Sequence, residues 1–80
     1  SSMSITVWSK DYCPYCAKIK TVFEQRSITF TEQVLDVDFV ADEFYSEFGV
    51  DATFPQVVID GEKIGGASDT VRHLVENGMI

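Results

Sequence analysis

Cys13 and Cys16 are the residues of this chain best suited to covalent chemistry. Their spacing places Cys13 at the end of a loop and Cys16 one turn into a predicted helix, so the two sulfurs can approach bonding distance. The free N–H groups and the positive dipole end of that helix favour an anion. The pattern therefore predicts a redox dithiol in which the Cys13 thiolate is the nucleophile and Cys16 is the resolving thiol.

Two other interpretations of the cysteine pair fit the sequence less well. A zinc site requires about four ligands, and the chain has two cysteines and one histidine, His73. A structural disulfide at this spacing closes a loop of about four residues, which removes little entropy from the unfolded chain. We therefore expect the pair to serve redox chemistry, with no metal and no tightly bound cofactor.

A second candidate feature is the segment Thr53-Phe54-Pro55. Because proline donates no hydrogen bond to a sheet, Pro55 is expected at the first position of a strand. It fits an ordinary turn. It also fits a cis peptide that presents the Phe54 backbone N–H and C=O to an extended peptide ligand.

The third feature is a glycine pair, Gly65-Gly66, followed closely by Ser68 and Asp69. This pattern is common where a helix is simply capped. It also allows a ligand to approach the backbone closely, with a carboxylate at the helix N-terminus and an ammonium group beside Asp69.

The elements that must position these residues follow from hydrophobic periodicity. Residues 4–8 are β-branched and aromatic, which predicts a short strand. From Pro14, a favoured first helical residue, an apolar stripe predicts a helix over 14–26. Residues 28–37 are predicted to form a second strand.

The second half of the chain predicts four more elements. Asp38 is expected to cap a short helix that ends at Gly49 and carries an apolar stripe of Val40, Phe44 and Phe48. The apolar run 57–59 indicates a central strand covered on both faces. Asp60-Gly61 predicts a two-residue hairpin that returns into a strand at 62–64.

Ser68 or Asp69 is expected to cap a last helix that ends at Gly78. The order β-α-β-α-β-β-α requires one parallel pair with a right-handed crossover and one antiparallel hairpin. The sequence thus predicts an α/β fold, a four-stranded mixed sheet flanked by helices. Residues 1–80 are expected to form a single domain, with Ser1 and Ser2 interpreted as an expression remnant.

The net charge of −7 is unevenly distributed. Residues 29–62 contain acidic residues and no lysine or arginine, which argues against nucleic-acid binding. This acidic segment is either a solvated face or a docking surface for a basic partner. Without a membrane-spanning apolar run or a leader pattern, the chain is expected to be cytoplasmic and monomeric.

Taken together, the three features resemble the glutaredoxin family from Met3 to Gly78: Cys13-Pro14-Tyr15-Cys16, then Thr53-x-Pro55, then Gly65-Gly66-x-x-Asp69. The resemblance implies a thioredoxin fold and glutathione-dependent thiol–disulfide exchange, with Cys13 as nucleophile, Cys16 as resolving cysteine and glutathione as co-substrate. The implied glutathione-binding residues are Lys10, Tyr15, Thr53, Phe54, Pro55, Gly66, Ser68 and Asp69.

The sequence departs from the family pattern in two places. Phe54 occupies a position usually taken by a small β-branched residue, and its ring is expected to narrow or reshape the groove. The family often places a cationic or amide side chain on the second helix, and residues 29–62 have no lysine or arginine. The carboxylates of glutathione are then expected to rely on Lys10, helix termini, and Gln33 or Gln56.

Three functions remain open from the sequence. The first is reduction of protein disulfides and glutathione mixed disulfides. The second is a dedicated electron donor, for example to ribonucleotide reductase, recycled by a thioredoxin-type reductase. The third, an iron–sulfur cluster carrier, fits less well because Pro14 and Tyr15 stiffen and crowd the motif. Glutathione and disulfide-containing or glutathionylated proteins are the expected partners, with no nucleic acid and no membrane.

Overall fold

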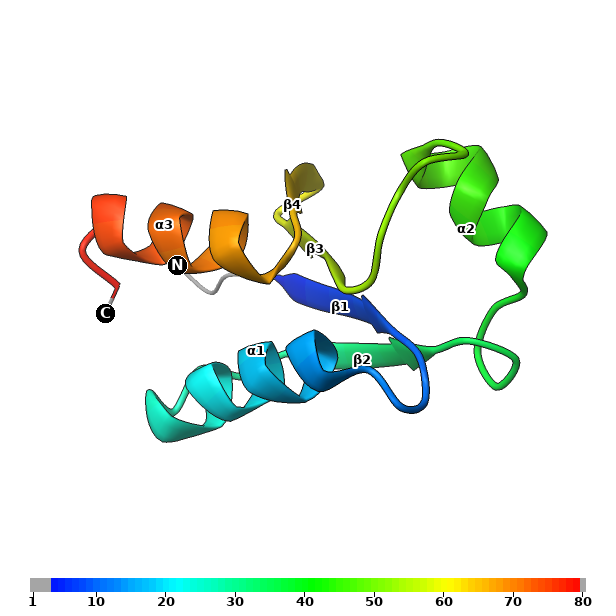
Figure 1. Cartoon of the computed structure of the whole chain (residues 1–80). Coiled ribbons are helices and arrows are strands. Elements are labelled where there is room, and N and C mark those ends of the chain that lie inside the picture. Colours follow the sequence, from blue (N-terminus) through cyan, green and yellow to red (C-terminus); the bar gives the residue numbers. More distant parts are fainter. Residues whose placement is uncertain (1–3, 80) are drawn as a thin grey trace.

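The computed structural model describes residues 4–79 and contains seven elements in the predicted order (Figure 1). The strands are β1 (Ile5–Ser9), β2 (Thr31–Val34), β3 (Gln56–Ile59) and β4 (Glu62–Gly65), and the helices are α1 (Pro14–Gln25), α2 (Ala41–Phe48) and α3 (Ala67–Glu76). The strand order is β2-β1-β3-β4. β1 is parallel to β2 and antiparallel to β3, which pairs antiparallel with β4. The predicted mixed sheet is confirmed.

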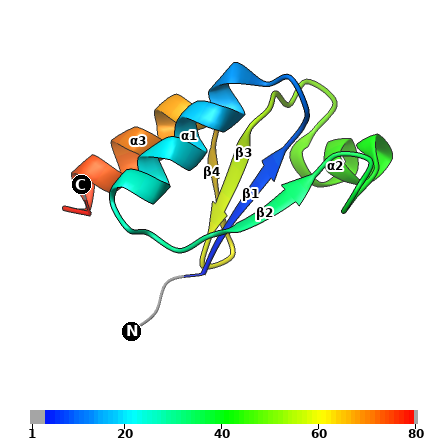
Figure 2. The same ribbon diagram turned by 90° about the horizontal axis from the view of Figure 1, so that it is seen from below.

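One face of the sheet carries the main core. Figure 2 shows α1 and α3 side by side against this face. Side chains alternate between the faces of a strand, so Val7 of β1 points into the core, and it is fully buried, as are Ile19 and Phe23 of α1. Full burial of one such side chain contributes about 1.5–3 kcal/mol. The core cluster comprises Ile5, Val7, Ile19, Phe23, Val57, Ile59 and Leu74.

The opposite face is covered at one end by an aromatic cluster, which consists of Trp8, Phe39, Phe44, Phe48 and Phe54. Trp8 meets Phe39 and Phe48 edge-on, with ring centroids 4.8 Å and 5.4 Å apart. Because Phe44 and Phe48 belong to α2, this helix packs on the sheet at the Trp8 end. Farther along, Val58 remains half-buried between the buried Val57 and Ile59. The expected cover of residues 57–59 on both faces is therefore only partial on the second face.

The second strand is shorter than predicted. The prediction covered 28–37, whereas β2 comprises only Thr31–Val34. Ile28 and Phe30 pack against the core from the preceding loop. Asp36 adopts a positive φ of 65° just beyond the strand, and this turn ends the pairing.

The predicted N-caps of α2 and α3 are also wrong. The Asp38 carboxylate accepts a hydrogen bond from Val34 N–H at 2.9 Å, so it secures the end of β2 instead of α2. Val40 is the N-cap of α2 and is exposed, outside the apolar stripe in which it was placed. For α3 the N-cap is Gly66, and Ser68 and Asp69 lie within its first turn.

The remaining predictions concern the chain's turns and ends. Asp60 and Gly61 both have positive φ, 51° and 83°, as the predicted hairpin requires. Gly49 ends α2 as predicted. Within residues 4–79 no helix has the length and apolar character needed to cross a membrane. The interpretation of Ser1 and Ser2 as an expression remnant lies outside the described residues.

Candidate active site

The cysteine pair lies at the start of α1. Cys13 is the N-cap and Cys16 lies in the first turn, and the two form a disulfide with Cα atoms 5.2 Å apart. Cys16 N–H donates a hydrogen bond to Cys13 Sγ at 3.2 Å. Negative charge on Cys13 is therefore stabilised by a helix N–H and by the helix dipole.

The two sulfurs differ in access. Cys16 is 1% exposed, whereas Cys13 is only half-buried. An external disulfide can thus reach Cys13 first, while Cys16 can attack only Cys13 Sγ, once that atom is bonded to a substrate sulfur. This geometry suits the roles predicted from the sequence.

A first hollow lies between the start of α1, the loop at 53–55 and the start of α3, and it has a volume of about 220 Å³. The Phe54–Pro55 peptide bond in this loop is cis, which is one of the two alternatives drawn from the sequence. The lining residues are Tyr15, Thr53, Phe54, Pro55, Gly66, Ala67, Ser68 and Asp69.

The second hollow adjoins the first and has a volume of about 360 Å³. It shares Tyr15, Thr53 and Phe54 with the first hollow and adds Cys13 and Lys10. Each glutathione-binding residue that the family resemblance implies therefore lines one of two adjoining hollows. Their roles in binding stay predictions, but the fold brings them together around Cys13.

Sequence reasoning missed three residues of the second hollow, Tyr12, Ala52 and Tyr45 of α2. Tyr45 is 38% exposed and follows the fully buried Phe44. The only signal for it was an aromatic residue beside the apolar stripe of a short helix. Such a signal does not show which hollow the ring borders.

The Phe54 ring belongs to the aromatic cluster. It stacks on Phe44 with centroids 4.1 Å apart and an interplanar angle of 12°. On the site side, Lys10 Nζ lies 5.2 Å from the centroid of the same ring, a cation–π arrangement. The Phe54 ring thus joins the loop at 53–55 to α2 and to Lys10.

The glycine pair gives Asp69 its place. Gly65 has a φ of +122°, and a Cβ at this position would lie 2.6 Å from Asp69 Oδ2. Any side chain at 65 would therefore displace the carboxylate from the space it occupies. Gly66 lies close to Pro55, whose carbonyl oxygen would be 3.6 Å from an added Cβ.

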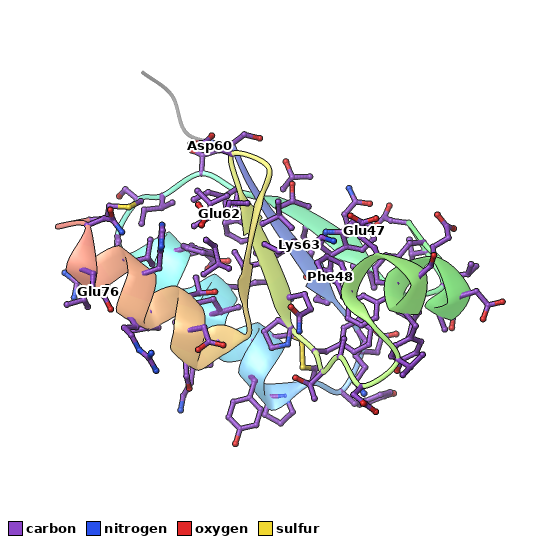
Figure 3. The ribbon with its side chains drawn as sticks, turned by 90° about the horizontal axis from the view of Figure 1, so that it is seen from above. Glu47, Phe48, Asp60, Glu62, Lys63 and Glu76 are labelled. Carbon is purple, nitrogen blue, oxygen red and sulfur yellow. A yellow bond between two sulfur atoms is a disulfide. The ribbon has the colours of Figure 1, made fainter. Side chains whose placement is uncertain are left out.

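Neither Gln33 nor Gln56 lines the two hollows. Gln56 Nε2 instead donates to Thr53 O at 2.8 Å and so supports the loop at 53–55. Lys63 is also engaged elsewhere: its Nζ donates to Glu47 O at 2.6 Å and lies 5.5 Å from the Phe48 ring centroid (Figure 3). None of these three side chains lines either hollow, so none supplies the cationic or amide group that the family pattern often places on the second helix.

Residues 4–79 contain no group of three or more His, Cys, Asp or Glu side chains that could hold a metal ion. His73 lies half-buried on α3.

Comparisons with known proteins agree on one family. The family model "Glutaredoxin" matches residues 5–64. Glutaredoxin-C6 of Oryza sativa subsp. japonica is 39% identical over 74 residues, which cover 89% of this chain and 66% of the rice protein. The chain therefore spans just under two thirds of the length of this relative.

Solved structures show the same fold. Glutaredoxin 1 from Francisella tularensis, complexed with cacodylate, has a TM-score of 0.80 at 28% identity. The match covers 98% of this chain and 98% of the Francisella chain. A buckwheat glutaredoxin–glutathione complex has a TM-score of 0.75 at 29% identity over 94% of this chain and 70% of its own. The mixed sheet with three helices is the thioredoxin fold. Since the family model covers most of the chain and the fold agrees throughout, the protein belongs to the glutaredoxin family, whose members are thiol–disulfide oxidoreductases.

Proposed function

We propose that this protein reduces glutathione mixed disulfides and protein disulfides, with glutathione as the electron donor. The observation that carries the proposal is the position of Cys13. Its sulfur accepts a hydrogen bond from a helix N–H at 3.2 Å, and Cys13 lines the second hollow and is more exposed than Cys16. The buckwheat relative was solved as a glutathione complex, which supports glutathione as the ligand of the two adjoining hollows.

Reduction of a glutathione mixed disulfide needs only Cys13. The Cys13 thiolate attacks the glutathione sulfur, a Cys13–glutathione disulfide forms, and the target leaves as a thiolate. A second glutathione thiolate then attacks the bound glutathione sulfur. This step releases glutathione disulfide and restores the Cys13 thiolate.

Reduction of a protein disulfide needs both cysteines. Cys13 attacks one target sulfur and the other target sulfur leaves as a thiolate. Cys16, after losing its proton, attacks Cys13 Sγ and releases the second target thiolate. The resulting Cys13–Cys16 disulfide is then reduced by two glutathione molecules, which leave as glutathione disulfide.

The two hollows divide the binding of glutathione in this proposal. At the first hollow, Asp69 pairs with the γ-glutamyl ammonium group, and the N-terminus of α3 with Ser68 receives its carboxylate. The backbone of Thr53 and Phe54 pairs with the extended tripeptide. Lys10, held beside the Phe54 ring, supplies positive charge at the second hollow.

A dedicated electron donor recycled by a thioredoxin-type reductase is the second candidate. The observation in its favour is that residues 29–62 hold no lysine or arginine, and that Lys63, the next cation, is paired with Glu47. The α2 side of the groove therefore offers glutathione little positive charge.

The reductant distinguishes the two candidates. The Cys13–Cys16 disulfide is incubated either with glutathione, glutathione reductase and NADPH, or with a thioredoxin-type reductase and NADPH. Rapid reduction by glutathione alone supports the main proposal, whereas reduction by the flavin reductase alone contradicts it. A cytoplasmic location, where reduced glutathione is abundant, is part of the proposal and is tested by cell fractionation.

A further inference from the structure

A groove of about 510 Å³ lies between α1 and α3, which run side by side (Figure 2). It shares Tyr15, Ala67 and Ser68 with the first hollow of the active site. The groove is therefore continuous with the surface that Cys13 presents to substrates, and beyond these shared residues it has no part in the proposed binding of glutathione.

The groove is apolar where the two helices meet. Ile19 is fully buried beneath it, and Val22, Ala67 and Val71 are half-buried along it. Apolar surface of this kind, left open to water between two helices, marks a binding groove more often than a random surface does.

Positive charge lines both sides of the same groove. Lys18 comes from α1 and Arg72 from α3, and both are exposed. Among residues 4–79 neither forms an ion pair, although Arg72 has Asp69 and Glu76 on its own helix. Although the chain has a net charge of −7, the charged residues that line this groove are both cations.

We infer that this groove receives the polypeptide segment next to the reactive cysteine of a protein substrate, and that it favours segments combining apolar and acidic side chains. The inference rests on the proposed function, because attack by Cys13 brings such a segment to the Tyr15 end. From Tyr15 to Val22 the groove follows two turns of α1, about 10 Å. That length fits about three extended residues of a partner.

Charge explains why an acidic segment is preferred. Lys18 and Arg72 attract acidic side chains and repel basic ones, and this attraction raises association rates in a salt-dependent way. The apolar part of the segment covers Val22 and Val71. A second copy of this chain is the competing occupant, and the experiment below separates it from a substrate segment.

The test uses the Cys16→Ser variant, which holds a substrate on Cys13. Three peptides each carry one cysteine activated as a thionitrobenzoate disulfide. The cysteine is flanked on both sides by Leu-Glu-Leu, by Leu-Lys-Leu or by Gly-Ser-Gly. The Cys13 thiolate attacks the peptide sulfur, a Cys13–peptide disulfide forms, and the thionitrobenzoate anion that leaves is measured by its absorbance.

We expect the Glu-containing peptide to react about tenfold faster than the Lys-containing peptide at low salt, with the ratio falling as salt is added. For each variant, the rates with the Glu- and Lys-containing peptides are divided by the rate with the Gly-Ser peptide. In the Cys16→Ser/Lys18→Glu double variant, these two normalised rates should be equal. Arg26→Glu changes the charge equally at the far end of α1 and should preserve the preference for the Glu-containing peptide. Equal rates for all three peptides would overturn the inference alone, whereas no release from any peptide would overturn the proposed function.

The trapped complexes give a second readout. In NMR spectra of the Cys13–peptide disulfide, the Glu-containing peptide should shift the backbone amide resonances of Val22, Val71 and Arg72 relative to the protein without peptide. Shifts confined to residues 53–55 and 66–69 would overturn the inference. Shifts at these groove residues that grow with protein concentration in the absence of peptide would also overturn it, in favour of a second copy.

Discussion

Gly65 determines where the Asp69 carboxylate can lie. A Cβ at Gly65 would stand 2.6 Å from Asp69 Oδ2, and its φ of +122° disfavours any side chain. We predict that Gly65→Ala raises the KM for a glutathione mixed disulfide several-fold while kcat changes little. Steady-state kinetics checks this prediction.

Gly61→Ala is the matched control for this substitution. Gly61 also has a positive φ, +83°, but an added Cβ there meets nothing within 4 Å. Both variants should lose about 1–2 kcal/mol of stability in urea unfolding, because a side chain is strained at positive φ. Only Gly65→Ala should change KM. An equal change of KM in both variants would mean that backbone strain, and not displacement of Asp69, is responsible.

Cys16 is the residue whose removal separates the two proposed reactions. It is 1% exposed, so we expect it to react with Cys13 and not with substrates. Cys16→Ser should retain reduction of glutathione mixed disulfides and lose turnover of an intramolecular protein disulfide. Parallel assays with a glutathionylated peptide and a disulfide-bonded protein check this prediction. Loss of both activities in a folded variant would contradict the roles assigned to the cysteines.

At the residue scale, the sequence was most informative where the chemistry is local. The cysteine spacing, the proline before a strand and the glycine pair are short patterns whose geometry depends on few neighbours. Tyr45 was missed because its place depends on how α2 packs. The hydrogen bond from the Gln56 amide to Thr53 O was also missed, because it depends on the fold of the loop at 53–55.

At the scale of elements, the aromatic cluster attaches α2 to the active-site loop. The Phe54 ring stacks on Phe44 at 4.1 Å, so α2 and the loop at 53–55 support each other. We predict that Phe54→Val costs about 1–3 kcal/mol of unfolding free energy through lost packing. It should also raise amide hydrogen exchange in α2 more than in α1. An equal increase of exchange in both helices would contradict the conclusion that Phe54 attaches α2 to the loop at 53–55.

A polar contact connects α1 to two strands. The Glu32 carboxylate of β2 accepts hydrogen bonds from Lys20 of α1 and, at 3.1 Å, from Ser9 Oγ of β1. The hydrogen bond from Lys20 is the largest cause that lowers the pKa of Glu32 below its usual 4.5, with Ser9 contributing and burial opposing. A carboxyl with a lowered pKa in the folded state stabilises the protein above pH 4.5, and this contribution is lost as the pH falls through the lowered pKa.

Glu32→Gln tests this contact. The Lys20 and Glu32 side chains are about one third exposed, so we expect their ion pair to contribute about 0.2–1 kcal/mol to the free energy of unfolding. The variant should be less stable than wild type by this amount at pH 7, and the difference should vanish in acid below the lowered pKa. Urea unfolding at both pH values checks this, with Glu24→Gln on the exposed side of α1 as control. A difference that persists in acid would assign the effect to packing.

The helices and strands were predicted well, but their ends were not. The apolar stripe located α2, and the β-branched runs located β1 and β3. The cap of α2 was wrong because Asp38 bonds Val34 N–H, a partner that exists only once β2 has formed. Strand β2 was overestimated because Ile28 and Phe30 pack into the core without belonging to the sheet.

For the whole molecule, the distribution of charge matters more than its sum. Glu47, Asp60, Glu62 and Glu76 lie on the side seen in Figure 3, spread over α2, the β3–β4 hairpin and α3. Lys18 and Arg72 lie along the groove between α1 and α3. The sequence showed the acidic segment but left its role open, and it could not show that two cations border one apolar groove, because they come from helices far apart in the chain.

The topology of the whole molecule was predictable because few arrangements satisfy the order of elements. A right-handed strand–helix–strand unit and a two-residue hairpin leave one natural mixed sheet. The incomplete cover of the second face was not predictable, since a continuous apolar run such as 57–59 looks the same whether one face or both are packed.

Steady-state reduction of a glutathione mixed disulfide tests most directly whether Cys13 is the nucleophile. Wild type, Cys13→Ser and Cys16→Ser are compared in an assay coupled to glutathione reductase and NADPH. We expect robust turnover by wild type, retained turnover by Cys16→Ser and none above background by Cys13→Ser. Full turnover by Cys13→Ser, or none by wild type while a dithiol still reduces its disulfide, would contradict this role of Cys13.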